Sequence, residues 1–357
     1  MGKKLAILLV TLTGLVGISS GFVAGGLQAY TRYQQNVGQE HCGGQKPVHI
    51  CVQVPLEVFS AYYPYYLSTN TSLFKIRYSS SSAITLIISV SIVGFTQVEN
   101  HTVTAGSDEQ TTTFTPALLD QAVRKLTSDV NTSISVRVTD TRNNLYFFND
   151  TPLLLHAHEL MQWVAANRLK IAAWVTPDDP AVTALVTKAT SHLASEIAPT
   201  PDAMIGYTNH ATPQQVSDQV DAIFDALRLD YHIHYSPEPV PYNGPNDTSI
   251  SLESIKLPSE VLQQRSGMCI ELTTLLASAV EQIGLHAEIV ITPGHAFLGV
   301  AVTPDNTQFQ YWDAVQVNNN VAGVSDNIAT DREYSTGPIV DTILVSNARL
   351  QGVGPMV

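Results

Sequence analysis

The longest apolar stretch of the chain lies at its N-terminus. Residues 5–29 carry no charged side chain and follow Lys3 and Lys4. A helix needs about 20 apolar residues to cross a bilayer, and lysines on a short flank favour a cytoplasmic N-terminus. We therefore expect residues 1–32 to form a membrane anchor, with the remaining domains extracytoplasmic. The alternative is a cleaved signal peptide, which would leave a secreted protein.

After this stretch the pattern becomes polar and then alternating. Residues 33–48 are rich in Gly and Gln, which is typical of a linker. From Val52 to about Leu155, β-branched and aromatic runs alternate with Ser, Asn, Thr and Gly. Short strands at this spacing predict an antiparallel, immunoglobulin-like β-sandwich over residues 49–165. The segment "TPALLDQAVRKL" interrupts the strands with a short helical stretch.

The apolar period then changes towards 3.6 residues. Residues 153–175 and 180–197 have apolar positions consistent with helices. Thr212 can cap a further helix, because Pro213 suits its first position and Gln215 completes a capping box. The overall prediction is an α+β fold in which the β-sandwich is followed by a mixed domain over residues 170–357.

A fourth helix begins near Cys269 and is followed by three strands. The apolar positions after Cys269 recur at helical spacing as far as Ile283, and Gly284 then stops the helix. The segments "LHAEIVIT", "HAFLGVAV" and "QFQYWDAV" follow as strands, separated by the turn signals "PG" and "TPDNT". Antiparallel pairing of these strands against the helix would form a compact layer.

Composition and charge narrow the classes of function. The apolar fraction is 44% and the charged fraction 14%, so the chain is expected to fold rather than to be disordered. The 31 acidic residues exceed the 18 basic ones, giving a net charge of -13. Phosphate binding needs clustered Lys and Arg, so we expect no nucleic-acid partner. Cys42 and Cys51 are close enough to form a disulfide in an oxidising compartment, or they stay unpaired.

Cys269 is the candidate reactive residue. A helix N-terminus favours an anion, so it would favour the thiolate form of a cysteine in the first turn. A thiolate nucleophile needs a base, and the base needs a group that orients it. His295 begins the second predicted strand and Asp313 lies near the end of the third. The alternative for Cys269 is a small buried apolar residue, the usual place of a free cysteine.

The order of these motifs resembles the transglutaminase-like superfamily. The matching segments are "DAIFDALRLDYHIHY", "RSGMCIELTTLLASAVEQIGLHAEIV", "PGHAFLGV" and "YWDAV", within about residues 200–357. The resemblance implies a papain-like triad with Cys269 as nucleophile, His295 as general base and acid, and Asp313 as the orienting group. Phe297 departs from the pattern, because many members carry Trp there. The expected activity is hydrolysis or acyl transfer at an amide of a protein or peptide, with no cofactor and no metal.

The rival function is a catalytically silent module. In that interpretation the fold binds peptides or cell-surface material, and the β-sandwich is the docking part. Gln263 and Gln264 are candidates for a side-chain oxyanion donor, although a solvated position at the helix edge is the simpler interpretation. The histidines of "HAHE", His156 and His158, are interpreted as structural, because no second ligand cluster accompanies them.

Overall fold

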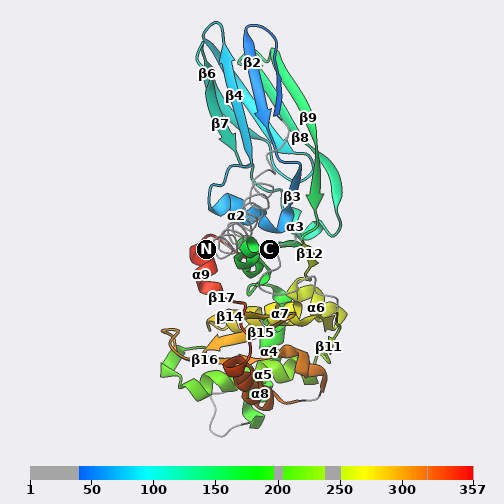
Figure 1. Ribbon diagram of the computed structural model, residues 1–357, viewed down its shortest axis with the longest axis vertical. Helices are drawn as coiled ribbons and strands as arrows, with labels where there is room; N and C mark the ends of the chain where they lie inside the picture. Colours follow the sequence, from blue (N-terminus) through cyan, green and yellow to red (C-terminus); the bar gives the residue numbers. More distant parts are fainter. Residues whose placement is uncertain (1–39, 197–203, 238–250, 320, 357) are drawn as a thin grey trace, which may run out of the picture.

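The computed structural model describes residues 40–196, 204–237, 251–319 and 321–356. Figure 1 shows an elongated molecule with an all-β part at one end and a mixed part of helices and strands at the other. The fold is therefore α+β. One continuous cluster of buried apolar side chains extends through both parts, so the two ends share a core.

The prediction of a membrane anchor needs correction. Its segment, residues 1–32, lies outside the described residues. Within the described ranges, no helix combines the length and the apolar character needed to cross a bilayer. The longest of these helices, α4 (Pro180–Glu196) and α5 (Pro213–Leu229), have 17 residues each, fewer than the roughly 20 that a span requires. The expectation of a transmembrane helix, and of the membrane-anchored location drawn from it, is wrong for the structure described here.

Two sheets make up the all-β part. The first has the order β1 (Glu40–Gly43), β2 (Val48–Gln53), β4 (Phe74–Ser80) and β7 (Gln110–Phe114). The second has the order β3 (Glu57–Phe59), β9 (Leu145–His156), β8 (Val130–Asp140), β5 (Ile84–Ile92) and β6 (Glu99–Ala105). Alternate residues of the long strands are buried, as Phe74, Ile76, Tyr78 and Ser80 are along β4, because one face of each sheet packs on the core. Only β3 and β9 pair in parallel among these strands.

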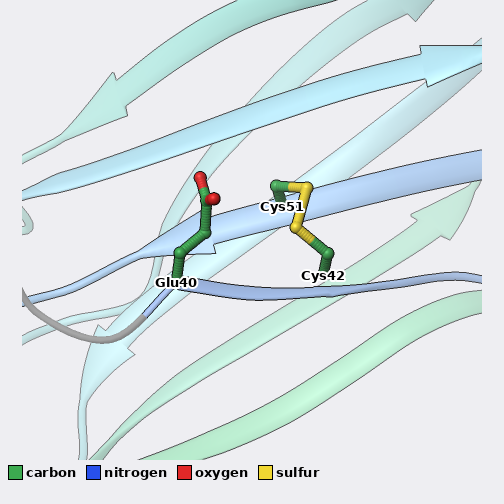
Figure 2. A group of neighbouring side chains, drawn as sticks. All are labelled: Glu40, Cys42 and Cys51. Carbon is green, nitrogen blue, oxygen red and sulfur yellow. A yellow bond between two sulfur atoms is a disulfide. The ribbon is translucent and has the colours of Figure 1, made fainter.

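Strand β1 occupies part of the segment that we assigned to a linker. It pairs with β2 in antiparallel register, with Cys42 opposite Cys51. The two cysteines form a disulfide, which Figure 2 shows bridging the neighbouring strands. Backbone pairing and this covalent link explain why a Gly- and Gln-rich sequence is ordered as a strand here.

The segment that joins the two ends differs from the sequence prediction. Residues 153–175, predicted as a helix, instead contain the end of β9, strand β10 (Leu160–Trp163) and the 3-10 helix η2 (Ala165–Trp174). Pairing of β9 with β8, and of β10 with β12 (Ser251–Ser254), overrides the apolar pattern of the segment. The short helices η1 (Ser60–Tyr62), α2 (Tyr63–Ser68) and α3 (Ala122–Lys125) close the same end of the sandwich.

In the mixed part, a four-stranded sheet packs against helix α7 (Cys269–Gln282) through its two central strands. The sheet order is β16 (Phe309–Trp312), β15 (His295–Ala301), β14 (Ala287–Thr292) and β17 (Asp341–Leu344), antiparallel throughout. The three predicted strands thus pair as neighbours, and β17 adds a fourth that the sequence did not indicate. The remaining elements are η3 (Thr208–His210), β11 (His234–Tyr235), α6 (Pro258–Gln264), β13 (Ser266–Gly267), η4 (Ala314–Asn319), α8 (Gly323–Thr336) and α9 (Val345–Leu350).

The capping signals of α5 are present as predicted. The Thr212 hydroxyl accepts a hydrogen bond from the Gln215 backbone N–H at 3.3 Å, and the Gln215 side chain accepts one from the Thr212 N–H at 2.9 Å. Every residue from Val216 to Leu227 is buried, including the polar Ser217, Asp218 and Asp225. The helix is therefore enclosed on its polar face as well as on its apolar face.

Candidate active site

Cys269 is the first residue of α7. Met268, immediately before it, has extended backbone angles, so the helix begins directly at the cysteine. Cys269 is 4% exposed and is the free cysteine of the described residues. The helix can start here because Gly267 leaves space, since an added Cβ would lie 3.1 Å from Leu272 and 3.2 Å from Val261. The fold thus places the thiol at the positive end of a buried 14-residue helix.

His295 is the first residue of β15. It follows Gly294, whose φ of +75° forms the tight turn from β14. The β14–β15 pairing places Thr292 directly opposite His295. The imidazole therefore lies at the end of the sheet near the N-terminus of α7, and it lines the same small cavity as Cys269.

Asp313 follows the last residue of β16, on the strand next to His295. Its Oδ2 lies 2.9 Å from Nε2 of His295. Its own backbone N–H donates to Asp326 at 2.6 Å, and its Oδ1 accepts from the Val315 N–H at 3.1 Å. These bonds fix the carboxylate, so the ring nitrogen that remains for Cys269 is Nδ1.

The neighbouring Trp312 anchors the same strand end. It is fully buried, and its indole N–H donates to Asp221 of α5 at 2.7 Å. Burial raises the pKa of Asp221 to about 7, and the Trp312 bond opposes the rise. The end of β16 is therefore held from two sides, by α5 and by α8.

The imidazole of His295 is electrostatically biased towards its protonated form. Burial by itself lowers the pKa of a histidine, but the hydrogen-bonded Asp313 and the neighbouring Cys269 outweigh it and raise the pKa of His295 to about 10. An imidazolium between a carboxylate and a thiol is the partner that a thiolate requires. The sequence-predicted residues Cys269, His295 and Asp313 are thus brought together by the fold.

A small cavity lies beside the thiol. It has a volume of about 20 Å³, close to the room that one water molecule needs. Its lining consists of Trp163, Glu253, Cys269, Ile270, Ile291, Thr292, His295 and Ala296. Most of these side chains are apolar, so a group that enters is largely removed from water.

No known family model matches the chain, and no curated protein matches it either. The resemblance to the transglutaminase-like superfamily therefore stays a prediction from the sequence motifs.

Trp163 is a site residue that the sequence did not indicate. Its indole N–H is buried and makes no hydrogen bond within the described part of the chain. The residue reaches the cavity because β10 pairs with β12, with Trp163 opposite Ser251. This pairing joins segments about ninety residues apart in the sequence. We predicted a helix over residues 153–175, so the sequence analysis did not identify the strand that carries Trp163.

Tyr235 also approaches the site. It lies on β11, which pairs in parallel with β13 directly before the nucleophile. Burial raises its pKa, and the charges of Cys269 and Asp313 raise it further. By contrast, Gln263 and Gln264 are exposed and do not line the cavity, so they do not supply an oxyanion donor there.

The histidines of "HAHE" lie elsewhere and are paired with carboxylates. His156 is 2.9 Å from Asp129 and 3.3 Å from Glu57, and His158 is 3.1 Å from Glu260. Both side chains are buried. His156 links segments of the all-β part, and His158 joins that part to α6, so both have a structural role.

One group of side chains within the described residues has the spacing of metal ligands: Glu40, Cys42 and Cys51. Both sulfur atoms are in the disulfide, so they cannot act as thiolate ligands. The Glu40 carboxylate is also bound to Arg77 at 2.6 Å. This cluster is better explained as a stabilised edge of the sandwich.

Proposed function

We propose that this protein is a thiol enzyme that acts on an amide of a peptide or a glutamine side chain through a Cys269 thioester. The observation that carries the proposal is the convergence of Cys269, His295 and Asp313. They come from a helix start, a strand start and a strand end. His295 is hydrogen-bonded to Asp313 at 2.9 Å and lines the same cavity as Cys269. A binding role does not require these three groups to meet.

The residues support a balanced two-step reaction. In the resting pair Nδ1 of His295 already holds the proton of the thiol, and the Cys269 thiolate attacks the carbonyl carbon. The carbon–nitrogen bond then breaks, the leaving amine takes the proton from the imidazolium, and a thioester remains on Cys269. Water or a second amine then gives a proton to His295 and attacks the thioester, which releases the acyl group and restores the thiolate–imidazolium pair.

Trp163 is suited to stabilise the tetrahedral intermediate. Its buried N–H has no acceptor in the described structure, and the residue lines the same cavity as Cys269. A preorganised donor in a water-poor site stabilises a developing oxyanion more than a solvated donor does. The first turn of α7 adds backbone N–H groups that lack acceptors within the helix.

The rival proposal is a silent binding module of the same fold. The size of the cavity favours it, because about 20 Å³ beside a thiol of 4% exposure admits little more than one small group. In the enzyme, the substrate must present its amide on a slender chain. In the module, the thiol would remain a buried packing residue.

Trapping of an acyl-enzyme separates the two. Wild-type protein and Cys269→Ala are incubated with p-nitrophenyl acetate and with a panel of glutamine-bearing peptides, and intact mass is recorded. The enzyme predicts an adduct on the wild type that is absent from the variant and that is removed by a primary amine or by water. The lack of an adduct with every probe would favour the binding module.

A further inference from the structure

Glu271 is a buried carboxylate two residues after the nucleophile. It is 1% exposed. Its Oε2 accepts a hydrogen bond from the Met268 N–H at 2.9 Å, and its Oε1 accepts one from the Lys256 N–H at 2.9 Å. The Lys256 ammonium lies 3.3 Å from Oε2. A single side chain thus binds two backbone segments and one cation.

These contacts provide the Glu271 carboxylate with the hydrogen bonds and the cation that burial requires. A buried carboxylate is stable only when it is paired and hydrogen-bonded. Gly267 helps, because an added Cβ there would approach Oε2 of Glu271 to 3.3 Å. The Met268 N–H is one of the donors at the start of α7 that lack an acceptor within the helix. Glu271 therefore closes the helix start that carries Cys269.

The backbone segment at Lys256, which Glu271 binds through Oε1, leads to another wall of the cavity. Lys256 closely follows β12, and β12 pairs with β10, which carries Trp163. Glu253 of β12 and Trp163 both line the cavity next to Cys269. The Glu271 carboxylate consequently links α7, which carries Cys269, to the β10–β12 pair, which carries Trp163.

We propose that Glu271 is a positioning residue that holds the Cys269 thiol at His295 and at a fixed separation from the wall formed by β10 and β12. This inference rests on the proposed function, in which the thiol reacts as an anion beside an imidazolium. Glutamine in place of Glu271 keeps the shape but presents an amide N–H₂ to one of the two backbone donors. One contact is then lost, and the start of α7 loosens.

Glu281 offers a matched control on the same helix. It is at the other end of α7, where its Oε1 accepts from the Ala287 N–H at 2.9 Å. Like Glu271, it is a carboxylate that ties α7 to a neighbouring backbone segment. Glu281→Gln should therefore lower stability without affecting the thiol.

The test is the pH dependence of iodoacetamide alkylation of Cys269, together with the melting temperature of each variant. Cys42 and Cys51 are in the disulfide, so the label reports one site. We expect Glu271→Gln to lower the rate at about pH 6.5 by about tenfold and to raise it at about pH 9.5, where exposure rather than ionisation limits the reaction. Glu281→Gln should leave both rates within about twofold of the wild type.

The positioning role is overturned if Glu271→Gln lowers the melting temperature as Glu281→Gln does and leaves the alkylation profile unchanged. A wild-type profile like that of an ordinary thiol, with a midpoint near about pH 8.5, would refute the proposed function instead. The positioning role is then judged from the rate at high pH alone, which must rise in Glu271→Gln and not in Glu281→Gln. If Glu271→Gln does not fold, Glu271→Asp reaches only one backbone donor and must show the same changes in smaller measure.

Discussion

Nε2 of His295 is bonded to Oδ2 of Asp313 at 2.9 Å, which leaves Nδ1 as the nitrogen for the thiol of Cys269. The carboxylate thus determines both the orientation of the ring and its charge. It also fixes which nitrogen exchanges a proton with the sulfur.

Replacement of Asp313 by Asn should lower the pKa of His295 from about 10 towards the ordinary value, because the charge and the charged acceptor are both lost. A raised histidine pKa stabilises the fold fully below the ordinary value of about 6.5 and loses this effect as the pH rises to the folded value. Between about pH 6.5 and pH 10, Asp313→Asn should therefore lose less stability than the wild type does as the pH rises. NMR titration of the His295 ring measures the pKa directly. Asp108→Asn, on an exposed turn, serves as the control and should titrate like the wild type.

Replacement of Trp163 by Phe should impair acylation selectively. The ring still fills the cavity wall, but the buried N–H is removed. Loss of one oxyanion donor lowers the acylation rate by about 100-fold in comparable sites, whereas alkylation by iodoacetamide forms no oxyanion and should not change.

Trp174→Phe is the comparison for this variant. Trp174 is buried and donates to the Ile255 carbonyl at 2.7 Å, so its loss lowers stability. It does not line the cavity, and acylation of the folded variant should persist. If Trp163→Phe and the wild type are acylated at the same rate, the indole N–H does not stabilise the oxyanion.

The pairing of His158 with Glu260 predicts a pH window of stability. Burial by itself lowers the pKa of His158, but the ion pair with Glu260 outweighs burial, and the pKa of His158 is raised overall. For Glu260 the reverse holds: burial by itself raises its pKa, but the ion pair with His158 outweighs burial, and the pKa of Glu260 is lowered overall. The pair therefore stabilises the protein above the ordinary carboxyl value of about 4.5, and this effect declines as the pH rises above about 6.5 and through the raised value for His158. Thermal melts from acid to alkaline pH should show this decline in the wild type and a flatter profile in Glu260→Gln. Identical profiles would contradict the prediction.

Removal of the disulfide by Cys42→Ser and Cys51→Ser together should destabilise the sandwich. The bridge closes a loop with a sequence separation of 9, for which the chain-entropy estimate is about 2–3 kcal/mol. Denaturant unfolding measures the loss. The alkylation profile of Cys269 should be unchanged, because the bridge lies in the sandwich and the thiol in the mixed part (Figures 1 and 2).

The sequence predicted the parts of the site that depend on local pattern. The helical period after Cys269 and the turn before His295 placed those residues at element ends, and the short hairpins made β16, β15 and β14 neighbours. Trp163 could not be predicted in the same way. Its segment has an apolar pattern that is compatible with a helix, and its true structure depends on pairing with β12, a contact of long sequence separation. Strand β17 has four residues and is likewise defined by its partner β14.

The pairing of β10 with β12 has a consequence for how this chain can be divided. A fragment that began at residue 170, the predicted start of the second domain, would contain Cys269, His295 and Asp313. It would lack Trp163 and would leave β12 without its partner strand. The smallest piece able to perform the proposed chemistry is therefore longer than the piece that carries the three reacting groups, and the connection between the two ends of the molecule is itself part of the working unit.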